Sequence, residues 1–245
     1  MGKHKKAIGV YERGLKSAPD HPLLHFNIGV TYSRMGKSDE AKEHFKRTLV
    51  GNPAYISAHL ALGHEFLAAD QNIPGLLALL RFLTLEPDPA RSEGVLSLLR
   101  NVLESQAEEK AEGDVLVTIN SDSDTLEGDF SSAELMLAVS RAGQFTEERR
   151  DRTDLENMVD QLGSLFAFMD ETDEPKDTGF AMEYYVPYFV ELRKNNFQEA
   201  LVHYIHQSSE APAVSEWLDA NYQQVKRFED WSQTHQNWLI EMPDK

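Results

Sequence analysis

The sequence predicts an all-α protein in which short antiparallel helix pairs stack into a solenoid, followed by an acidic, mostly helical C-terminal module. Three observations predict this fold. Small, aromatic and proline residues recur every 34 residues through the first third of the chain. Apolar residues in the remainder recur at helical spacing. Only residues 115–119 have the composition of a strand, and they are too few for more than an isolated extended segment or a short edge.

The complete copy of the repeating pattern occupies residues 24–53. Its first helix carries Gly29 and Tyr32, its second carries Ala41 and Phe45, and Pro53 ends it. A shift of 34 places these kinds of residue on Gly63, Phe66 and Pro87, and the reverse shift places them on Ala7, Tyr11 and Pro19. A glycine in the middle of a helix costs about 1 kcal/mol relative to alanine, so each glycine predicts that another helix passes very close.

This period and pattern resemble the tetratricopeptide repeat over roughly residues 1–88. The resemblance implies a binding scaffold of antiparallel helix pairs, and it implies no particular partner. We expect pairs at 23–35 with 38–50 and at 56–69 with 74–85, then a terminal helix at 90–109. In the last pair, residues 70–74 replace the tight glycine turn, which predicts a looser turn.

The first helix, at residues 7–17, reads as the second member of a pair whose first member is absent from the pattern. Its apolar residues Ile8, Tyr11 and Leu15 are therefore expected to be partly uncovered. Exposed apolar edges attract partners, so the sequence predicts self-association through this helix or a missing upstream repeat.

The sequence is expected to divide into three parts. A first domain at 1–109 contains the repeats and the terminal helix. An acidic linker with a short extended segment follows at 110–130, and a helical module occupies 131–245. Two capping boxes, Ser131 with Glu134 and Thr153 with Glu156, predict helix starts. Pro187 is expected to break or kink a helix. The stretch at 195–201 resembles a worn repeat turn, and a long amphipathic helix is expected over 213–242. The module also resembles C-terminal segments of uncharacterised bacterial tetratricopeptide repeat proteins, which implies no activity.

Charge is divided unevenly within a net charge of −17. Residues 1–110 contain 14 Lys/Arg against 13 Asp/Glu, whereas the remainder contains 10 against 28. The acidic half repels phosphate backbones, so no nucleic-acid partner is expected, and a basic protein partner is one alternative to a merely solvated surface. No cysteine, secretory signal or membrane-spanning apolar run is present, so a cytoplasmic protein without a membrane partner is expected.

No catalytic motif is found, and no enzyme activity, cofactor or metal is predicted. His203 and His206 share a helix face but lack a further ligand, so they read as surface or half-buried side chains. The repeated His25 and His59 read as polar-tipped rings at helix starts. The polar loop at 120–129 alternates acidic residues but lacks the glycine and the closing glutamate of a calcium loop, so no specific calcium site is expected.

The predicted binding surface is the inner face formed by the first helix of each pair. Its residues are Phe26, Val30 and Ser33 in one pair and Leu60, His64 and Leu67 in the next. The family's lysine and asparagine clamp for a terminal carboxylate is absent, and an apolar groove suits an amphipathic helix or an extended apolar peptide. Two alternatives remain open: the C-terminal module fills this groove as core, or that module contains an unrecognised enzyme site.

Overall fold

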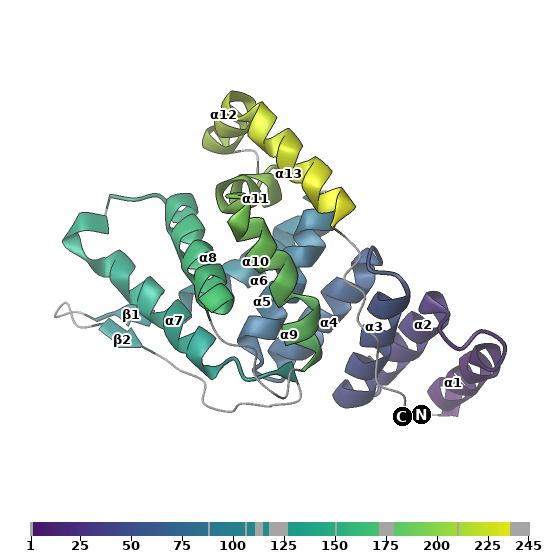
Figure 1. The fold of residues 1–245 in the computed structure, drawn as a ribbon. Coiled ribbons are helices and arrows are strands. Elements are labelled where there is room, and N and C mark those ends of the chain that lie inside the picture. The colour runs from purple at the N-terminus through teal and green to yellow at the C-terminus, as the bar shows by residue number, and fades with distance from the viewer. Residues whose placement is uncertain are drawn as a thin grey trace.

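The computed structural model of the protein is an all-α fold that carries one small β-hairpin among the residues it describes. Those residues are 2–87, 89–105, 107–110, 115–117, 127–149, 151–171, 179–209 and 211–235. Figure 1 shows the first helices running as an array from one end of the molecule to its middle, with later helices packed over the middle and the other end. The predicted fold class is confirmed.

In the N-terminal array, each helix packs against the next helix along the chain. They are α1 (Gly2–Leu15), α2 (Pro22–Ser33), α3 (Ser38–Gly51), α4 (Ile56–Ala68), α5 (Asn72–Leu85) and α6 (Pro89–Glu104). The two mid-helix glycines are close-approach points, as predicted. A Cβ atom on Gly29 would meet Phe45 at 2.7 Å, and one on Gly63 would meet Leu79 at 2.7 Å. Side chains larger than hydrogen would therefore push the paired helices apart.

The turn inside each repeat has the same left-handed geometry in both complete pairs. Gly36 has φ 70°, and Asp70, 34 residues later, has φ 56°. In both turns the following amide donates to a carbonyl five residues back, from Lys37 to Tyr32 at 3.1 Å and from Gln71 to Phe66 at 3.0 Å. The expectation of a looser second turn is therefore wrong, because aspartate tolerates the left-handed region better than most residues with a side chain.

A third turn of this kind lies far along the chain, between α10 and α11. Asn196 has φ 57°, and the amide of Phe197 donates to the carbonyl of Leu192 at 3.1 Å. The worn repeat turn predicted at residues 195–201 is confirmed in its geometry.

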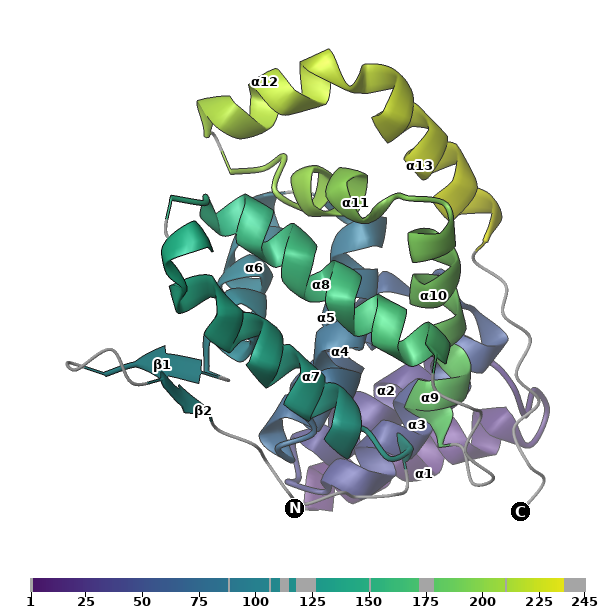
Figure 2. The ribbon, with the colours of Figure 1, turned by 60° about the vertical axis from the view of Figure 1, so that its left-hand side comes forward.

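The C-terminal part is also helical wherever the structure describes it. Its elements are α7 (Ser131–Ala142), the short 3-10 helices η2 (Gly143–Phe145) and η3 (Glu147–Arg149), α8 (Asp154–Glu171), α9 (Phe180–Tyr184), α10 (Val186–Lys194), α11 (Gln198–Ile205), α12 (Pro212–Ala220) and α13 (Tyr222–Thr234). Figure 2 shows α8 crossing the molecule beside α7, with α12 and α13 along one edge.

Several local predictions for this part are confirmed. The Thr153 amide donates to the Glu156 carboxylate at 2.8 Å, and the Glu156 amide donates to the Thr153 hydroxyl at 3.3 Å, which completes the capping box. Pro187 lies at the start of α10, and the helical run breaks at Tyr185, between α9 and α10. Phe166 and Met169 are buried, as expected of core residues.

Other local predictions are wrong. The helix after the acidic linker begins at Ser131, whose amide donates to the Asp129 carboxylate at 3.0 Å, so Ser131 is inside the helix rather than its cap. The terminal helix ends at Glu104, and β1 (Ala107–Glu109) pairs antiparallel with β2 (Val115–Val117), with Ala107 opposite Val117. The long final helix is two helices divided at Asn221.

The hydrophobic core is continuous across the proposed domain boundaries. One cluster of buried side chains extends from Ala41 in α3 to Phe228 in α13. At its centre, every residue of α5 from Ile73 to Thr84 is buried, because α5 contacts α4 and α6 and also α7, α9 and α11. The division at residues 109–110 and 130–131 stays a prediction about the organisation of the chain.

The shared turn geometry predicts opposite effects of glycine and alanine substitutions. Asp70→Gly and Asn196→Gly should each raise the free energy of unfolding by about 0.5 kcal/mol, because a side chain in the left-handed region is strained. Gly36→Ala should lower it by about 1 kcal/mol. Urea denaturation measures all three. Asp39→Gly, in the first turn of α3, is the control and should destabilise; a destabilised Asp70→Gly would refute the assignment of strain to these turns.

Candidate functional site

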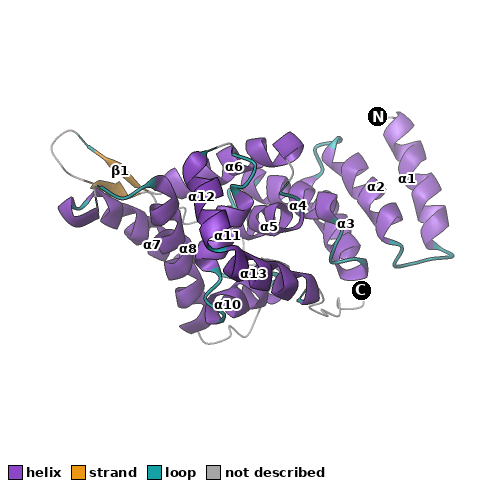
Figure 3. Cartoon of the chain, turned by 90° about the horizontal axis from the view of Figure 1, so that it is seen from above, coloured by secondary structure: helices purple, strands orange, loops and turns teal. Residues whose placement is uncertain are grey.

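The six residues of the predicted groove lie on α2 and α4, as the repeat pattern requires. Phe26, Val30 and Ser33 are half-buried on α2, and Leu60 and Leu67 are half-buried on α4, whereas His64 is exposed. Figure 3, which looks down on the array, shows α2 and α4 side by side with their neighbours in the first half of the molecule. The two helices also contact each other directly.

Two of these side chains are partly covered by contacts within the array itself. The ring of Phe26 packs between those of Phe45 and Tyr55, at centroid distances of 5.7 and 4.8 Å. Leu67 covers Gly75 on the next helix, where a Cβ atom would come within 2.5 Å of it. The groove residues therefore have one side against the repeat core and one side toward solvent.

The C-terminal elements join the array through a different set of residues. The Lys46 ammonium on α3 forms an ion pair with Glu127, a carboxylate just before α7, and also lies over the Phe180 ring at 5.6 Å. The Tyr184 hydroxyl donates to the Leu49 carbonyl at 3.4 Å. Sequence reasoning missed this interface, because none of its residues belongs to a recognisable motif.

Arg81 on α5 is the charged centre of this interface. It is 4% exposed, its guanidinium lies 4.1 Å from the centroid of the Tyr188 ring, and it donates to the Ser232 hydroxyl at 3.3 Å. The ring's negative face stabilises the buried cation. One side chain of the array thus connects to α10 and to α13 of the C-terminal part.

The two repeated histidines make the same contact in successive repeats. The Nε2 atom of His25 lies 2.7 Å from the Pro19 carbonyl, and that of His59 lies 2.9 Å from the Pro53 carbonyl, so each ring donates to the proline that closes the preceding repeat. The remaining Nδ1 of His59 accepts from the Tyr185 hydroxyl at 3.0 Å. The prediction of polar-tipped rings is confirmed, and in α4 the ring also contacts the C-terminal part.

Burial keeps these histidines neutral. Desolvation lowers the pKa of His59 to about 3, with the positive charge of Arg81 acting in the same direction. Desolvation and the neighbouring His25 lower the pKa of His44 to about 4, and desolvation also lowers the pKa of His25. These rings are structural acceptors and donors rather than proton carriers near neutral pH.

The other candidate ligand residues do not assemble into a metal site. His203 and His206 are buried, contrary to the expectation of surface or half-buried positions, and their Nδ1 atoms lie 2.9 and 2.7 Å from carbonyls of the preceding turn. His203 stacks on Trp217 with ring centroids 3.9 Å apart. No group of three or more metal-ligating side chains occurs in the described part of the chain. Asp122 and Asp124 of the calcium-like loop lie outside the described residues.

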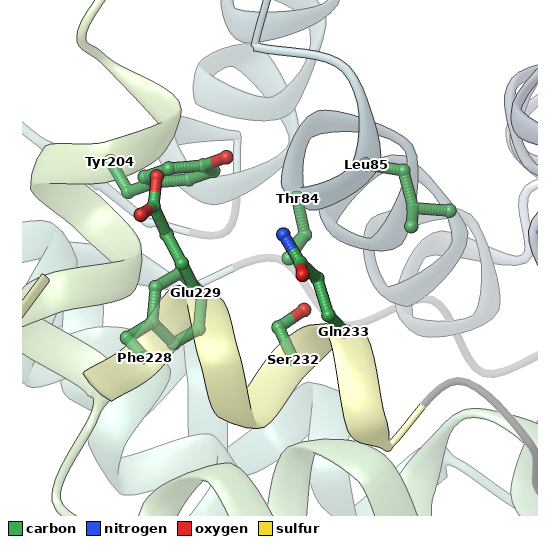
Figure 4. Close-up of a pocket in the computed structure, with 7 residues that line it drawn as sticks. All are labelled: Thr84, Leu85, Tyr204, Phe228, Glu229, Ser232 and Gln233. Atoms are coloured by element: carbon green, nitrogen blue, oxygen red, sulfur yellow. The ribbon is translucent and has the colours of Figure 1, made fainter. Parts of the chain in front are cut away.

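A small pocket opens between the end of α5, α11 and α13 (Figure 4). Its lining residues are Thr84, Leu85, Tyr204, Phe228, Glu229, Ser232 and Gln233, and its volume is about 180 Å³. Small-molecule sites typically occupy about 300–1,000 Å³. Glu229 is the single charged lining residue, and no histidine lines the pocket.

Comparison with known protein families gives one match, to the tetratricopeptide repeat family, over residues 10–43. This segment extends from the last turns of α1 through α2 into α3, the region where the 34-residue period is most complete. This segment of the chain therefore carries a tetratricopeptide repeat. No curated protein and no solved structure gave a significant match.

Tetratricopeptide repeats are protein-interaction scaffolds, and this is the general role that the repeat supports here. Across the described residues, no helix has the length and apolar character needed to span a membrane. The resemblance of the C-terminal module to bacterial proteins and the cytoplasmic location stay predictions.

The depressed histidine pKa values predict that the protein loses stability as the pH falls below about 6.5. Unfolded chains bind protons on histidine near that pH, whereas folded His59 stays neutral down to about pH 3. Between pH 6.5 and 4.5, a His59→Gln variant should lose about 2 kcal/mol less unfolding free energy than the wild type. Urea denaturation across this range measures the difference. A His59→Gln variant with the same pH slope as the wild type would contradict the assignment.

Proposed function

We propose that the inner faces of α2 and α4 form an apolar groove that binds a segment of a partner protein, either an amphipathic helix or an extended apolar peptide. The observation that carries the proposal is that half-buried apolar side chains lie at two of the three predicted inner positions on each helix, Phe26 and Val30 on α2 and Leu60 and Leu67 on α4. Phe26 and Val30 on α2 correspond by the 34-residue shift to Leu60 and His64 on α4. Apolar side chains at helical spacing on two helices that contact each other suit recognition of a partner segment through apolar anchors.

The interface with the C-terminal elements is a second support. Its identified contacts come from Lys46, Leu49, His59 and Arg81, and none of these is a groove residue. The module and a bound segment can therefore use different surfaces of the array. The groove has only Ser33 and His64 as polar members, so it has no cationic clamp for a terminal carboxylate.

The enzyme alternative has no comparable observation in its favour. The pocket between α5, α11 and α13 is small, and its Ser232 hydroxyl lies 2.9 Å from the Tyr188 hydroxyl rather than beside a base.

Selection from a displayed library of amphipathic helical and extended apolar peptides tests the groove. The wild-type protein should select peptides that bind with measurable fluorescence anisotropy. Leu60→Glu should weaken their binding by more than about tenfold, because a carboxylate would be desolvated against apolar anchors. Its unfolding free energy should fall by only about 1 kcal/mol, since Leu60 is half-buried.

His64→Glu tests the same surface at an exposed position where folding is not at risk, and it should also weaken binding. Tyr222→Glu, on α13 and 62% exposed, is the matched control and should bind as the wild type does. Peptides that bind all three variants equally would refute the groove. A melting temperature about ten degrees lower in Leu60→Glu would identify the groove as core and redirect the search to the acidic half.

A further inference from the structure

The most exposed large apolar side chains of the described residues gather at two ends of the molecule. Val10 on α1 and Leu23 on α2 are 54% and 49% exposed, and Leu116 on β2 with Leu135 and Val139 on α7 are 45–55% exposed. Only Tyr222 has this character elsewhere among these residues. Figures 1 and 3, viewed at right angles to each other, both have α1 at one extreme and α7 with the hairpin at the other.

The α1 end combines its exposed apolar side chains with positive charge. Residues 2–20 contain five Lys/Arg against two Asp/Glu. Ile8, expected to be uncovered, is 7% exposed and packs into the array, whereas Tyr11 and Leu15 are half-buried. The prediction for Ile8 is wrong because α2 covers that side of α1, and the apolar contact that α1 offers is Val10.

The opposite end combines an apolar helix face with negative charge. Leu135 and Val139 are one turn apart on α7 and therefore lie on one face, and α7 packs against both strands of the hairpin that carries Leu116. Within residues 104–154, the positions that the structure describes carry ten Asp/Glu against four Lys/Arg. Each end thus has an apolar centre and a net charge opposite to that of the other end.

We propose that these two ends are the halves of one interface, through which copies of the chain associate head to tail. The α1–α2 end of one copy docks on the α7–hairpin end of the next. The ends lie at opposite extremes of the molecule, so one chain cannot join them itself. Opposite charges orient the encounter, and Val10 and Leu23 of one copy are removed from water against Leu135 and Val139 of the other.

This arrangement has a consequence that separates it from a symmetric dimer. A head-to-tail interface does not close unless the rotation between copies returns to its start, so each added copy leaves one docking end open. The average mass in solution should therefore continue to rise with protein concentration beyond that of a dimer. Added salt should weaken the association, because exposed charges are screened.

The decisive experiment mixes two variants, each with one end disabled. Val10→Glu adds a like charge to the end that meets the acidic surface, and Val139→Glu places a carboxylate in the apolar centre of the other end. In sedimentation velocity each variant alone should be monomeric, with association weakened by more than about tenfold. An equimolar mixture should form a one-to-one dimer and nothing larger, since each variant supplies the intact end that the other lacks.

Tyr222→Glu should associate like the wild type, because Tyr222 lies at neither end. Circular dichroism confirms that each variant keeps its helices. Wild type that stays monomeric up to millimolar concentration would overturn the proposal. A wild-type dimer that only one of the two end variants abolishes, while the other variant still dimerises by itself, would replace it with a symmetric contact.

Discussion

The structure depends on covering one helix on all sides. From Ile73 to Leu85 the sequence of α5 is apolar except at Arg81 and Thr84, and such a helix is stable only when it is surrounded. The repeat array by itself provides α4 and α6 as neighbours. The remaining surface of α5 is covered by α7, α9 and α11 of the C-terminal part, so the two halves of the chain share one core. Tetratricopeptide repeat helices usually need only stacking neighbours, whereas this one also needs a separate cover.

Polar contacts around α5 determine how the C-terminal helices pack on it. Arg81 cannot reach water, so its position is fixed by the Tyr188 ring and the Ser232 hydroxyl, which come from two different helices. His59 fixes Tyr185 in a similar way, because its other nitrogen is already bonded to the Pro53 carbonyl. A buried polar group has few ways of being satisfied, so these contacts select one arrangement of the two halves.

The sequence predicted the features that follow from local rules. The 34-residue period located the helix pairs, the glycines located their closest approaches, and the Thr153–Glu156 pair and Pro187 located a helix start and a helix break. The left-handed turn at Asp70 was missed because aspartate only permits that geometry, whereas glycine favours it. The buried positions of His203 and His206 and the Arg81 interface depend on contacts between distant segments, which no periodicity in one sequence reveals. The nearly continuous apolar sequence of α5 was a signal that more helices had to surround it.

The candidate groove and the exposed ends could be predicted only in part from the sequence. The groove positions on α2 and α4 follow from the repeat register, whereas their half-burial depends on Tyr55 and Gly75, which belong to neighbouring elements. The exposed ends depend on the overall arrangement of helices, so they could be found only in the structure. The charge difference between the two halves was visible in the sequence, but its separation to opposite ends was not.

The array and the C-terminal elements share α5, so they should unfold as one unit. All three tryptophans lie in the C-terminal part of the sequence, so tryptophan fluorescence reports on that part alone, whereas far-ultraviolet circular dichroism reports on every helix. Both signals should be followed through the same urea titration. Because the two parts share one core, both signals should show a single transition with the same midpoint. A fluorescence transition complete while helical signal from the array persists would contradict it.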